Sequence, residues 1–223
     1  MNATPTRVAI VGGHGKIARL TIPLLLEQGI DVVALARRAE QRQTLSALGA
    51  EARALDIEAS TANDFATAFA GCDAVVFCAG AGADGQAGRK TTVDLGGALK
   101  TITAARSCGI TRVVQVSAIG VDNPPSPERG AVWAAYVKAK RDADAALRVS
   151  GLDWTILRPG RLTDTEPLGT VSLGDHVARA EIPRADVAAV IAAAVVRPET
   201  IGNQWNLVSG PDPVDVAITH ATA

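Results

Sequence analysis

The chain has 223 residues, of which 48% are hydrophobic and 20% are charged. This length suits one domain, which can bury a full hydrophobic core without disulfides or metals. Lysine and arginine total 22 and aspartate and glutamate total 23, so the formal net charge is −1. Nucleic acids and anionic membranes attract proteins with a basic excess, which this chain lacks, and we expect neither as a partner.

The cysteines and the apolar runs indicate the compartment. Cys72, Cys78 and Cys108 are odd in number and far apart in the sequence, which disfavours a disulfide framework and a zinc site. No signal-peptide pattern precedes the first apolar run. The longest apolar stretch, residues 187–196, is half of the ~20 residues that a membrane span needs. We therefore expect a cytoplasmic protein without a bound metal.

Short apolar runs alternate with helical patterns along the chain. Strands are predicted at residues 7–11, 31–36, 52–55, 73–78, 111–117, 154–157 and 204–208, with shorter ones at 171–173 and 178–182. Helices are predicted at residues 16–28, 41–48, 61–70, 93–107, 132–149 and 184–197. Continuous apolar strands separated by helices are typical of a parallel sheet covered on both faces, so we predict an α/β fold with a doubly wound sheet.

A glycine-rich loop joins the first strand to the first helix, and its residues are Gly12, Gly13, His14, Gly15, Lys16, Ile17 and Ala18. The glycines permit a tight turn and a close approach to a pyrophosphate, and the small Ala18 lets helix and strand pack closely. The start of the helix offers N–H groups to phosphates. Two registers fit: G-x-G-x-x-A begins at Gly13, and G-x-x-G-x-x-A begins at Gly12. The alternative is a turn that only connects the strand to the helix. The position of the glycine loop after the first strand favours a dinucleotide site.

The end of the second strand indicates which dinucleotide is bound. NAD-selective sites usually place an acidic residue there, to bond the ribose 2′-hydroxyl. Here the strand is followed by Arg37 and Arg38, and Asp31 lies at the opposite end. Guanidinium groups bond phosphate oxygens in pairs and suit a 2′-phosphate, so we predict NADP(H) in preference to NAD(H). Two solvated arginines before a surface helix are the alternative.

Several further motifs follow in a characteristic order: residues 55–57 (LDI), 78–80 (CAG), 116–118 (VSA), 136–140 (YVKAK) and 150–160 (SGLDWTILRPG). Together with the glycine loop they resemble the atypical short-chain dehydrogenases/reductases, and especially their NAD(P)H-binding, epimerase/dehydratase-like branch. The resemblance extends from Val8 to Gly210. It implies one Rossmann-fold NAD(P)-binding domain over residues 1–223, with small substrate-facing elements at about 160–182.

The resemblance also implies positions around the cofactor. Asp56, with Ile57 beside it, would contact the adenine. The backbone of Cys78, Ala79 and Gly80 would line the adenosine ribose, and Pro159 would lie beside the nicotinamide. Each of these also has a purely structural alternative, because an acid after a strand commonly caps a helix and a glycine there commonly makes a turn.

Tyr136 and Lys140 are the strongest catalytic candidates. They are four residues apart on a predicted helix, so their side chains leave the same face. An ammonium favours ionisation of a nearby phenol, and Tyr136 would then move a proton while Lys140 holds the nicotinamide ribose. Ser117, at the end of a strand, would bond the substrate oxygen. By the resemblance, Asp94 stands where better-studied relatives have an asparagine in a proton relay. A surface aromatic–lysine pair is the alternative for Tyr136.

These residues predict an NADP(H)-dependent reductase or dehydrogenase that acts on a small carbonyl, quinone or alcohol. The irregular stretches 81–90, 121–130 and 161–179 would surround this small-molecule substrate, with Trp133 either in the pocket wall or in the core. A non-catalytic NADPH-binding redox sensor and an epimerase-like enzyme are the alternatives. No feature of the sequence predicts an oligomer.

Overall fold

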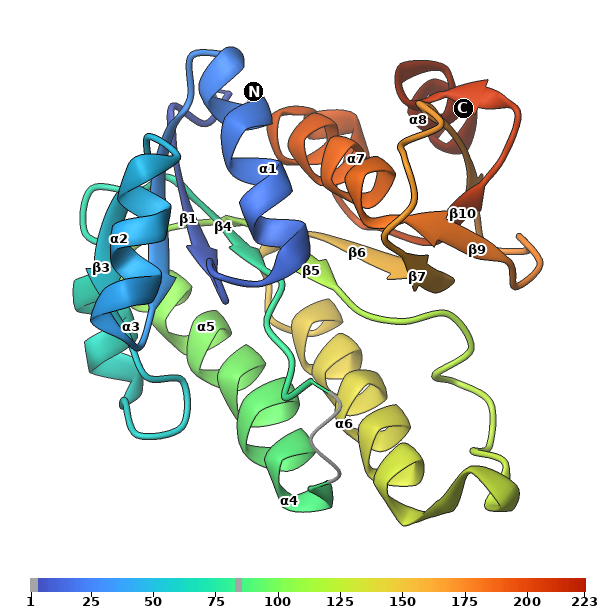
Figure 1. Ribbon diagram of the computed structural model, residues 1–223, viewed down its shortest axis with the longest axis horizontal. Coiled ribbons are helices and arrows are strands. Elements are labelled where there is room, and N and C mark those ends of the chain that lie inside the picture. The colour runs from blue at the N-terminus through green and yellow to red at the C-terminus, as the bar shows by residue number, and fades with distance from the viewer. Residues whose placement is uncertain (1–3, 83–85) are drawn as a thin grey trace.

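The computed structural model describes residues 4–82 and 86–223. Figure 1 shows a central sheet with helices on both faces. The first half of the chain contains β1 (Arg7–Val11), α1 (Lys16–Glu27), β2 (Asp31–Ala36), α2 (Ala39–Ala47), β3 (Glu51–Ala54), α3 (Ala62–Ala68), β4 (Ala74–Phe77), α4 (Ala87–Arg89), the π-helical η1 (Lys90–Leu95), α5 (Gly96–Ser107) and β5 (Arg112–Val116). The second half contains η2 (Pro127–Arg129), α6 (Gly130–Arg148), β6 (Asp153–Pro159), β7 (Arg161–Thr163), β8 (Thr170–Gly174), β9 (Glu181–Pro183), α7 (Arg184–Val196), η3 (Pro198–Thr200), β10 (Asn203–Ser209), β11 (Asp212–Pro213) and α8 (Val214–Thr222).

The strands of the main sheet lie in the order β11-β8-β10-β6-β5-β4-β1-β2-β3. From β3 to β10 every neighbouring pair is parallel, and β1 pairs with both β2 and β4. The chain therefore starts in the middle of the sheet, runs out to β3 and returns to the other side of β1. Ligands of doubly wound sheets bind at this switch point, beyond the carboxyl ends of β1 and β4.

Alternate residues of the strands supply two hydrophobic cores. Val8 and Ile10 of β1 pack in the core that contains α1 and α7, and Ala9 and Val11 pack in the core that contains α5 and α6. Figure 1 shows α1 and α7 above the sheet and α5 and α6 below it. This two-sided burial confirms the predicted doubly wound α/β fold.

The structure differs from the predicted elements in the start of one helix and in several short elements of the second half of the chain. The helix expected from residue 93 begins earlier, with the π-helical η1, and the elements β7, β11 and α8 were not expected. The sheet is also mixed at one edge, because β8 runs antiparallel to β10 and β11 runs antiparallel to β8. Short antiparallel edge strands are common additions to parallel sheets, and their pairing is fixed by tertiary contacts that local patterns do not report. Within the described ranges, no helix is both long and apolar enough to cross a membrane.

Candidate functional site

The glycine loop is held against two strands of the sheet. Gly12 has φ +81°, and a Cβ on it would lie 2.8 Å from the Cα atom of Ala79 after β4. The N–H of Gly13 donates to the carbonyl of Leu35 in β2 at 3.0 Å, and the N–H of Gly15 donates to Gly12 at 2.8 Å. Gly12 thus makes the tight turn that the G-x-x-G-x-x-A register requires. The fully buried Ala18 packs α1 on the sheet, as that register also requires.

Helix α1 begins directly after this loop with no side-chain cap. Its N-cap is Gly15, which has no side chain to bond the first N–H groups of the helix. Such N–H groups, together with the positive end of the helix dipole, suit a phosphate. A backbone cradle of this kind, in which Gly12 lies too close to Ala79 to carry a side chain, fits the diphosphate of a dinucleotide.

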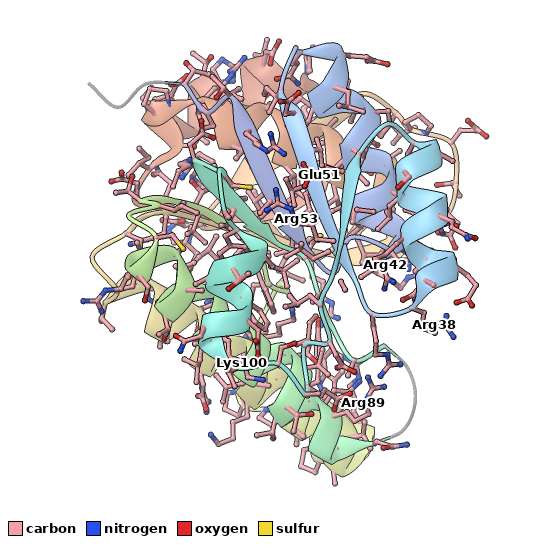
Figure 2. The ribbon with its side chains drawn as sticks, turned by 90° about the vertical axis from the view of Figure 1, so that its left-hand side faces the viewer. Arg38, Arg42, Glu51, Arg53, Arg89 and Lys100 are labelled. Carbon is pink, nitrogen blue, oxygen red and sulfur yellow. The ribbon has the colours of Figure 1, made fainter. Side chains whose placement is uncertain are left out.

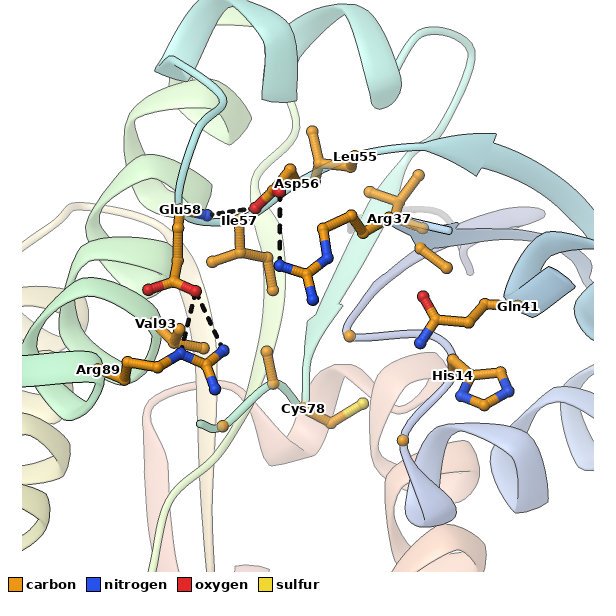
Figure 3. Close-up of a pocket in the computed structure, with 16 residues that line it drawn as sticks. His14, Arg37, Gln41, Leu55, Asp56, Ile57, Glu58, Cys78, Arg89 and Val93 are labelled. Atoms are coloured by element: carbon orange, nitrogen blue, oxygen red, sulfur yellow. Dashed lines mark hydrogen bonds and ion pairs between the residues drawn. The ribbon is translucent and has the colours of Figure 1, made fainter. Parts of the chain in front are cut away.

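A pocket of about 290 Å³ opens beside the loop, at the predicted adenosine position. Figure 3 shows its walls, which come from the glycine loop, the end of β2, the turn after β3 and the end of β4. Nine of the predicted cofactor residues line it: Gly12, His14, Gly15, Arg37, Asp56, Ile57, Cys78, Ala79 and Gly80. Burial of Cys78 raises the pKa of its thiol to about 12, so this side chain stays a neutral thiol at neutral pH.

The charged residues of this pocket are arranged in opposite pairs. A guanidinium nitrogen of Arg37 lies 3.6 Å from a carboxylate oxygen of Asp56, whose other oxygen accepts the N–H of Glu58 at 3.0 Å. Asp56 therefore caps its own turn and also faces the pocket. Glu58 in turn lies 3.0 Å from Arg89 of α4 (Figure 3). It also accepts a hydrogen bond from the Thr92 hydroxyl at 2.7 Å. These bonds lower the pKa of Glu58, that from Thr92 most.

The remaining predicted cofactor residues lie near this pocket or in the sheet behind it. Arg38 is exposed at the start of α2, and Figure 2 shows it at the edge of the molecule near Arg42. Lys16 points away, and its ammonium lies 2.5 Å from a carboxylate oxygen of Asp164, which follows β7. Ile17 packs against the core, and Gly13 is buried beside Leu35. Partial burial, then Arg19 and Arg38, lower the pKa of His14.

A second pocket, of about 770 Å³, lies at the carboxyl ends of β5 and β6. Its walls come from the β5–α6 connection, the first turns of α6, the β6–β7 turn and the segment before β9. Tyr136, the predicted proton-transfer residue, lines this pocket. Pro159, which is predicted to lie beside the nicotinamide, lines it too. The Tyr136 ring stands 5.3 Å from the Trp133 ring, between centroids, so Trp133 belongs to the pocket wall. No residue of the described ranges, 4–82 and 86–223, lines both the adenosine pocket and this second pocket.

Desolvation controls the acidity of Tyr136. Burial raises the pKa of its phenol, the negative charges of Asp94 and Asp144 raise it further, and Lys140 and Arg179 oppose them. The net direction is upward from the ordinary value of 10.0. Tyr136 is therefore a phenol, and not a phenolate, at neutral pH.

Lys140 and Asp94 are buried together beneath the second pocket. The Lys140 ammonium donates to the carbonyls of Val116 at 3.0 Å and Ala79 at 3.3 Å, and lies 3.4 Å from a carboxylate oxygen of Asp94. The other Asp94 oxygen accepts the N–H of Ala81 at 3.0 Å. Lys140 thus makes two hydrogen bonds to carbonyls, and its contact with Asp94 is an ion pair in which that buried Asp94 oxygen has no hydrogen-bond partner among the described residues. In this arrangement the pair ties the ends of β4 and β5 to η1 and α6.

Ser117 belongs to a buried hydrogen-bond network that the sequence pattern does not predict. Its hydroxyl donates to a carboxylate oxygen of Asp144 at 2.7 Å. Asp144 also accepts hydrogen bonds from Gln115 at 2.7 Å and Arg158 at 2.9 Å, and Arg158 pairs with Asp122 at 2.5 Å. The available signal was the spacing of Asp144, which comes four residues after Lys140 and so lies on the same face of α6. Among the described residues, no cluster of histidine, cysteine, aspartate or glutamate could hold a metal ion.

Comparisons with known proteins agree with this geometry. Residues 12–198 match the family described as NAD(P)H-binding. The uncharacterized sugar epimerase YhfK of Bacillus subtilis is 35% identical over 213 residues, which are 95% of this chain and 98% of that protein. A solved structure described as an NAD-dependent epimerase/dehydratase, from Bacillus halodurans, is 37% identical with a TM-score of 0.88, and covers 96% of this chain and 99% of its own.

A second solved structure, described as an anaerobilin reductase of Escherichia coli O157:H7, is more distant. It is 26% identical with a TM-score of 0.72, and covers 92% of this chain and 97% of its own. These findings confirm the predicted Rossmann fold and the resemblance on which the cofactor positions were based.

Proposed function

Because this chain belongs to the NAD(P)H-binding family of Rossmann-fold proteins, we propose that it is an NADP(H)-dependent oxidoreductase that reduces a small carbonyl or quinone compound. The observation that carries the proposal is the position of Tyr136, the one tyrosine of the chain. It lines the 770 Å³ pocket together with Pro159 and Gly160. This pocket and the glycine loop both lie at the carboxyl ends of the parallel strands. A proton donor thus stands in a pocket large enough for a small molecule, beside the expected cofactor position.

The glycine loop, the start of α1 and the turn around Asp56 would hold the dinucleotide. A reduced nicotinamide supplies a hydride when it is bound. The chain's own part is to supply the proton, and Tyr136 would donate it from its phenol oxygen to the substrate oxygen. The raised pKa of Tyr136 keeps that proton on the phenol at neutral pH, which is the form that donates a proton in the reduction.

The proposed preference for NADP(H) rests on the end of β2. Arg37 lines the adenosine pocket, and Arg38 lies exposed beside it at the start of α2. No acidic residue follows β2 before Glu40, so a ribose 2′-hydroxyl would lack its usual acceptor there. Guanidinium groups in this position suit a 2′-phosphate.

The test is NADPH oxidation, followed by ultraviolet absorbance, with a panel of quinones, aldehydes and ketones. Replacing Tyr136→Phe removes only the phenol oxygen, and we expect kcat to fall about 10²- to 10⁴-fold, the usual contribution of a general acid. The dissociation constant for NADPH should stay unchanged, since Tyr136 lies outside the adenosine pocket. Turnover that survives the substitution would remove Tyr136 as the acid.

Two other outcomes point to different functions. Tight NADPH binding without turnover of any compound in the panel would favour a redox sensor. The second alternative function is that of an epimerase, and it is supported by the names of two similar proteins, which include the word epimerase. An epimerase returns the hydride to its substrate, so it would show no net NADPH consumption while it inverts a stereocentre.

The pH profile is an independent check on Tyr136. Since burial raises the pKa of its phenol above the ordinary 10.0, kcat for reduction should be flat from pH 7 to about 9 and fall only above the raised pKa. A fall in kcat that is centred near pH 8 would mean that another group supplies the proton.

A further inference from the structure

The second pocket has an unusual charge balance. Five of its lining residues are cationic, namely Lys90, Arg129, Arg161, Arg179 and Arg184. No aspartate or glutamate lines it in the part of the chain that the structure describes. The adenosine pocket differs, because Asp56 and Glu58 line it beside Arg37 and Arg89. A cavity walled by charges of one sign attracts ligands of the other sign.

Some of these cations are already neutralised from outside the pocket. Arg161 forms an ion pair with Glu181, and a guanidinium nitrogen of Arg184 lies 2.6 Å from Asp164. The structure gives Arg129 and Arg179 no carboxylate partner among the described residues. Instead both lie near one ring: the guanidinium carbon of Arg129 is 3.4 Å from the centroid of Trp133, and that of Arg179 is 6.0 Å away. These two arginines are the positive charges that a ligand can reach.

The surroundings of Arg129 and Arg179 are flat and apolar. Trp133 and Tyr136 have ring centroids 5.3 Å apart and planes tilted by 34°, and Ile119 and Leu162 line the same pocket. Such a wall suits the conjugated or aromatic body of a ligand. An arginine stacked on tryptophan is also held with its N–H groups directed sideways, where they can bond an anion.

We propose that the substrate is a conjugated or aromatic carbonyl compound that carries an anionic group, a carboxylate or a phosphate. Arg129 and Arg179 bind that group, and Trp133 contacts the flat body. This inference rests on the proposed function, since it takes the second pocket as the substrate site. The cofactor's own phosphates do not explain the arginines, because the pocket at the glycine loop shares no described lining residue with this one.

The test measures binding, so it does not depend on turnover. Calorimetric titration of the NADP⁺-saturated protein would compare 2-naphthoate, 2-naphthyl phosphate and the neutral 2-naphthamide, which share one ring system. We expect at least one anion to bind about tenfold more tightly than the amide, as a charge-assisted hydrogen bond provides. The preferred anion identifies the group as carboxylate or phosphate.

Three variants assign the preference to the pocket. Arg129→Gln and Arg179→Gln should each reduce the ratio of anion to amide affinity several-fold, while Arg106→Gln should leave it unchanged. Arg106 is the matched control, because it is exposed on α5 and lies outside the pocket lining. Thermal unfolding would verify that all three variants fold.

The inference is overturned if neither anion binds more tightly than the amide, or if the preference survives in both Arg129→Gln and Arg179→Gln. A failure of the proposed function gives a different pattern. In that case no compound of the panel would oxidise NADPH, while the anion preference and its loss in the two variants would still be measured.

Discussion

The adenosine pocket and the second pocket are built in opposite ways. The adenosine pocket, about 290 Å³, is formed mainly by the ends of β1, β2, β3 and β4 and the turns after them, and five of its lining residues are glycine or alanine. The second pocket, about 770 Å³, is formed by long side chains from segments far apart in the sequence. Charge follows the same division, since carboxylates balance Arg37 and Arg89 in the first pocket but not Arg129 and Arg179 in the second.

This difference separates what the fold requires from what a substrate requires. The backbone of the first pocket cannot change without moving the sheet, whereas Arg129 and Arg179 of the second contact Trp133 through side chains alone. Members of one family can therefore bind the same cofactor and act on different substrates.

The largest expected effect is on the buried pair that lies beneath both pockets. Asp94 accepts the N–H of Ala81 and pairs with Lys140, and a Cβ on Gly80 would lie 3.1 Å from it. Replacing Asp94→Ala leaves the Lys140 ammonium buried without its carboxylate, and we expect the free energy of unfolding to fall by about 3–5 kcal/mol. Urea denaturation would measure the change.

The control for this change is Asp142→Ala on the outer face of α6. Asp142 pairs with Lys138 and is partly exposed, so its loss should cost under ~1 kcal/mol. Equal losses in the two variants would mean that the buried pair contributes no more than a surface pair does.

A substitution at Gly12 should disable the first pocket alone. A Cβ there meets the backbone of Ala79 at 2.8 Å and strains a φ of +81°. We expect Gly12→Ala to weaken NADPH binding about 100-fold, equivalent to about 2.7 kcal/mol, by displacing the loop that would cradle the phosphates. Fluorescence titration with NADPH gives the dissociation constant.

Gly71→Ala is the matched control, because Gly71 has φ +76° and no atom within 4 Å of its added Cβ. It carries the conformational strain of the left-handed region but cannot disturb the loop. If both variants bind NADPH as the wild type does, the glycine loop is a connector and does not hold the cofactor.

The cations of the first pocket should set cofactor preference. The double variant Arg37→Gln/Arg38→Gln removes both guanidinium groups at the end of β2, and we expect the ratio of NADPH to NADH affinity to fall about tenfold or more. NADH affinity itself should change little, since it has no 2′-phosphate. An unchanged ratio would show that these arginines are solvated surface residues, and Arg106→Gln again controls for net charge.

The same contrast explains what could be predicted from the sequence. The glycine loop, the parallel strands and the turn at Asp56 are local signals, because the residues that act together are close in the chain. The network of Ser117, Asp144 and Arg158 joins β5, α6 and β6, and the approach of Arg179 to Trp133 joins a late loop to α6. Such partners are fixed by tertiary packing, so the sequence pattern identified Ser117 as a candidate but did not show that its hydroxyl donates a hydrogen bond to Asp144.

The smallest expected effect is at Lys16, the first residue of α1, which is not among the described lining residues of either pocket. The glycine loop places it next to the predicted phosphates, but its ammonium pairs with Asp164, which also pairs with Arg184 at the edge of the second pocket. Lys16 and Asp164 are both more than half exposed, and exposed pairs contribute little. We therefore expect Lys16→Gln to weaken NADPH binding by no more than about twofold, as a weak surface charge would. A tenfold loss would mean that Lys16 leaves Asp164 and binds the phosphates, so that cofactor binding would break this ion pair.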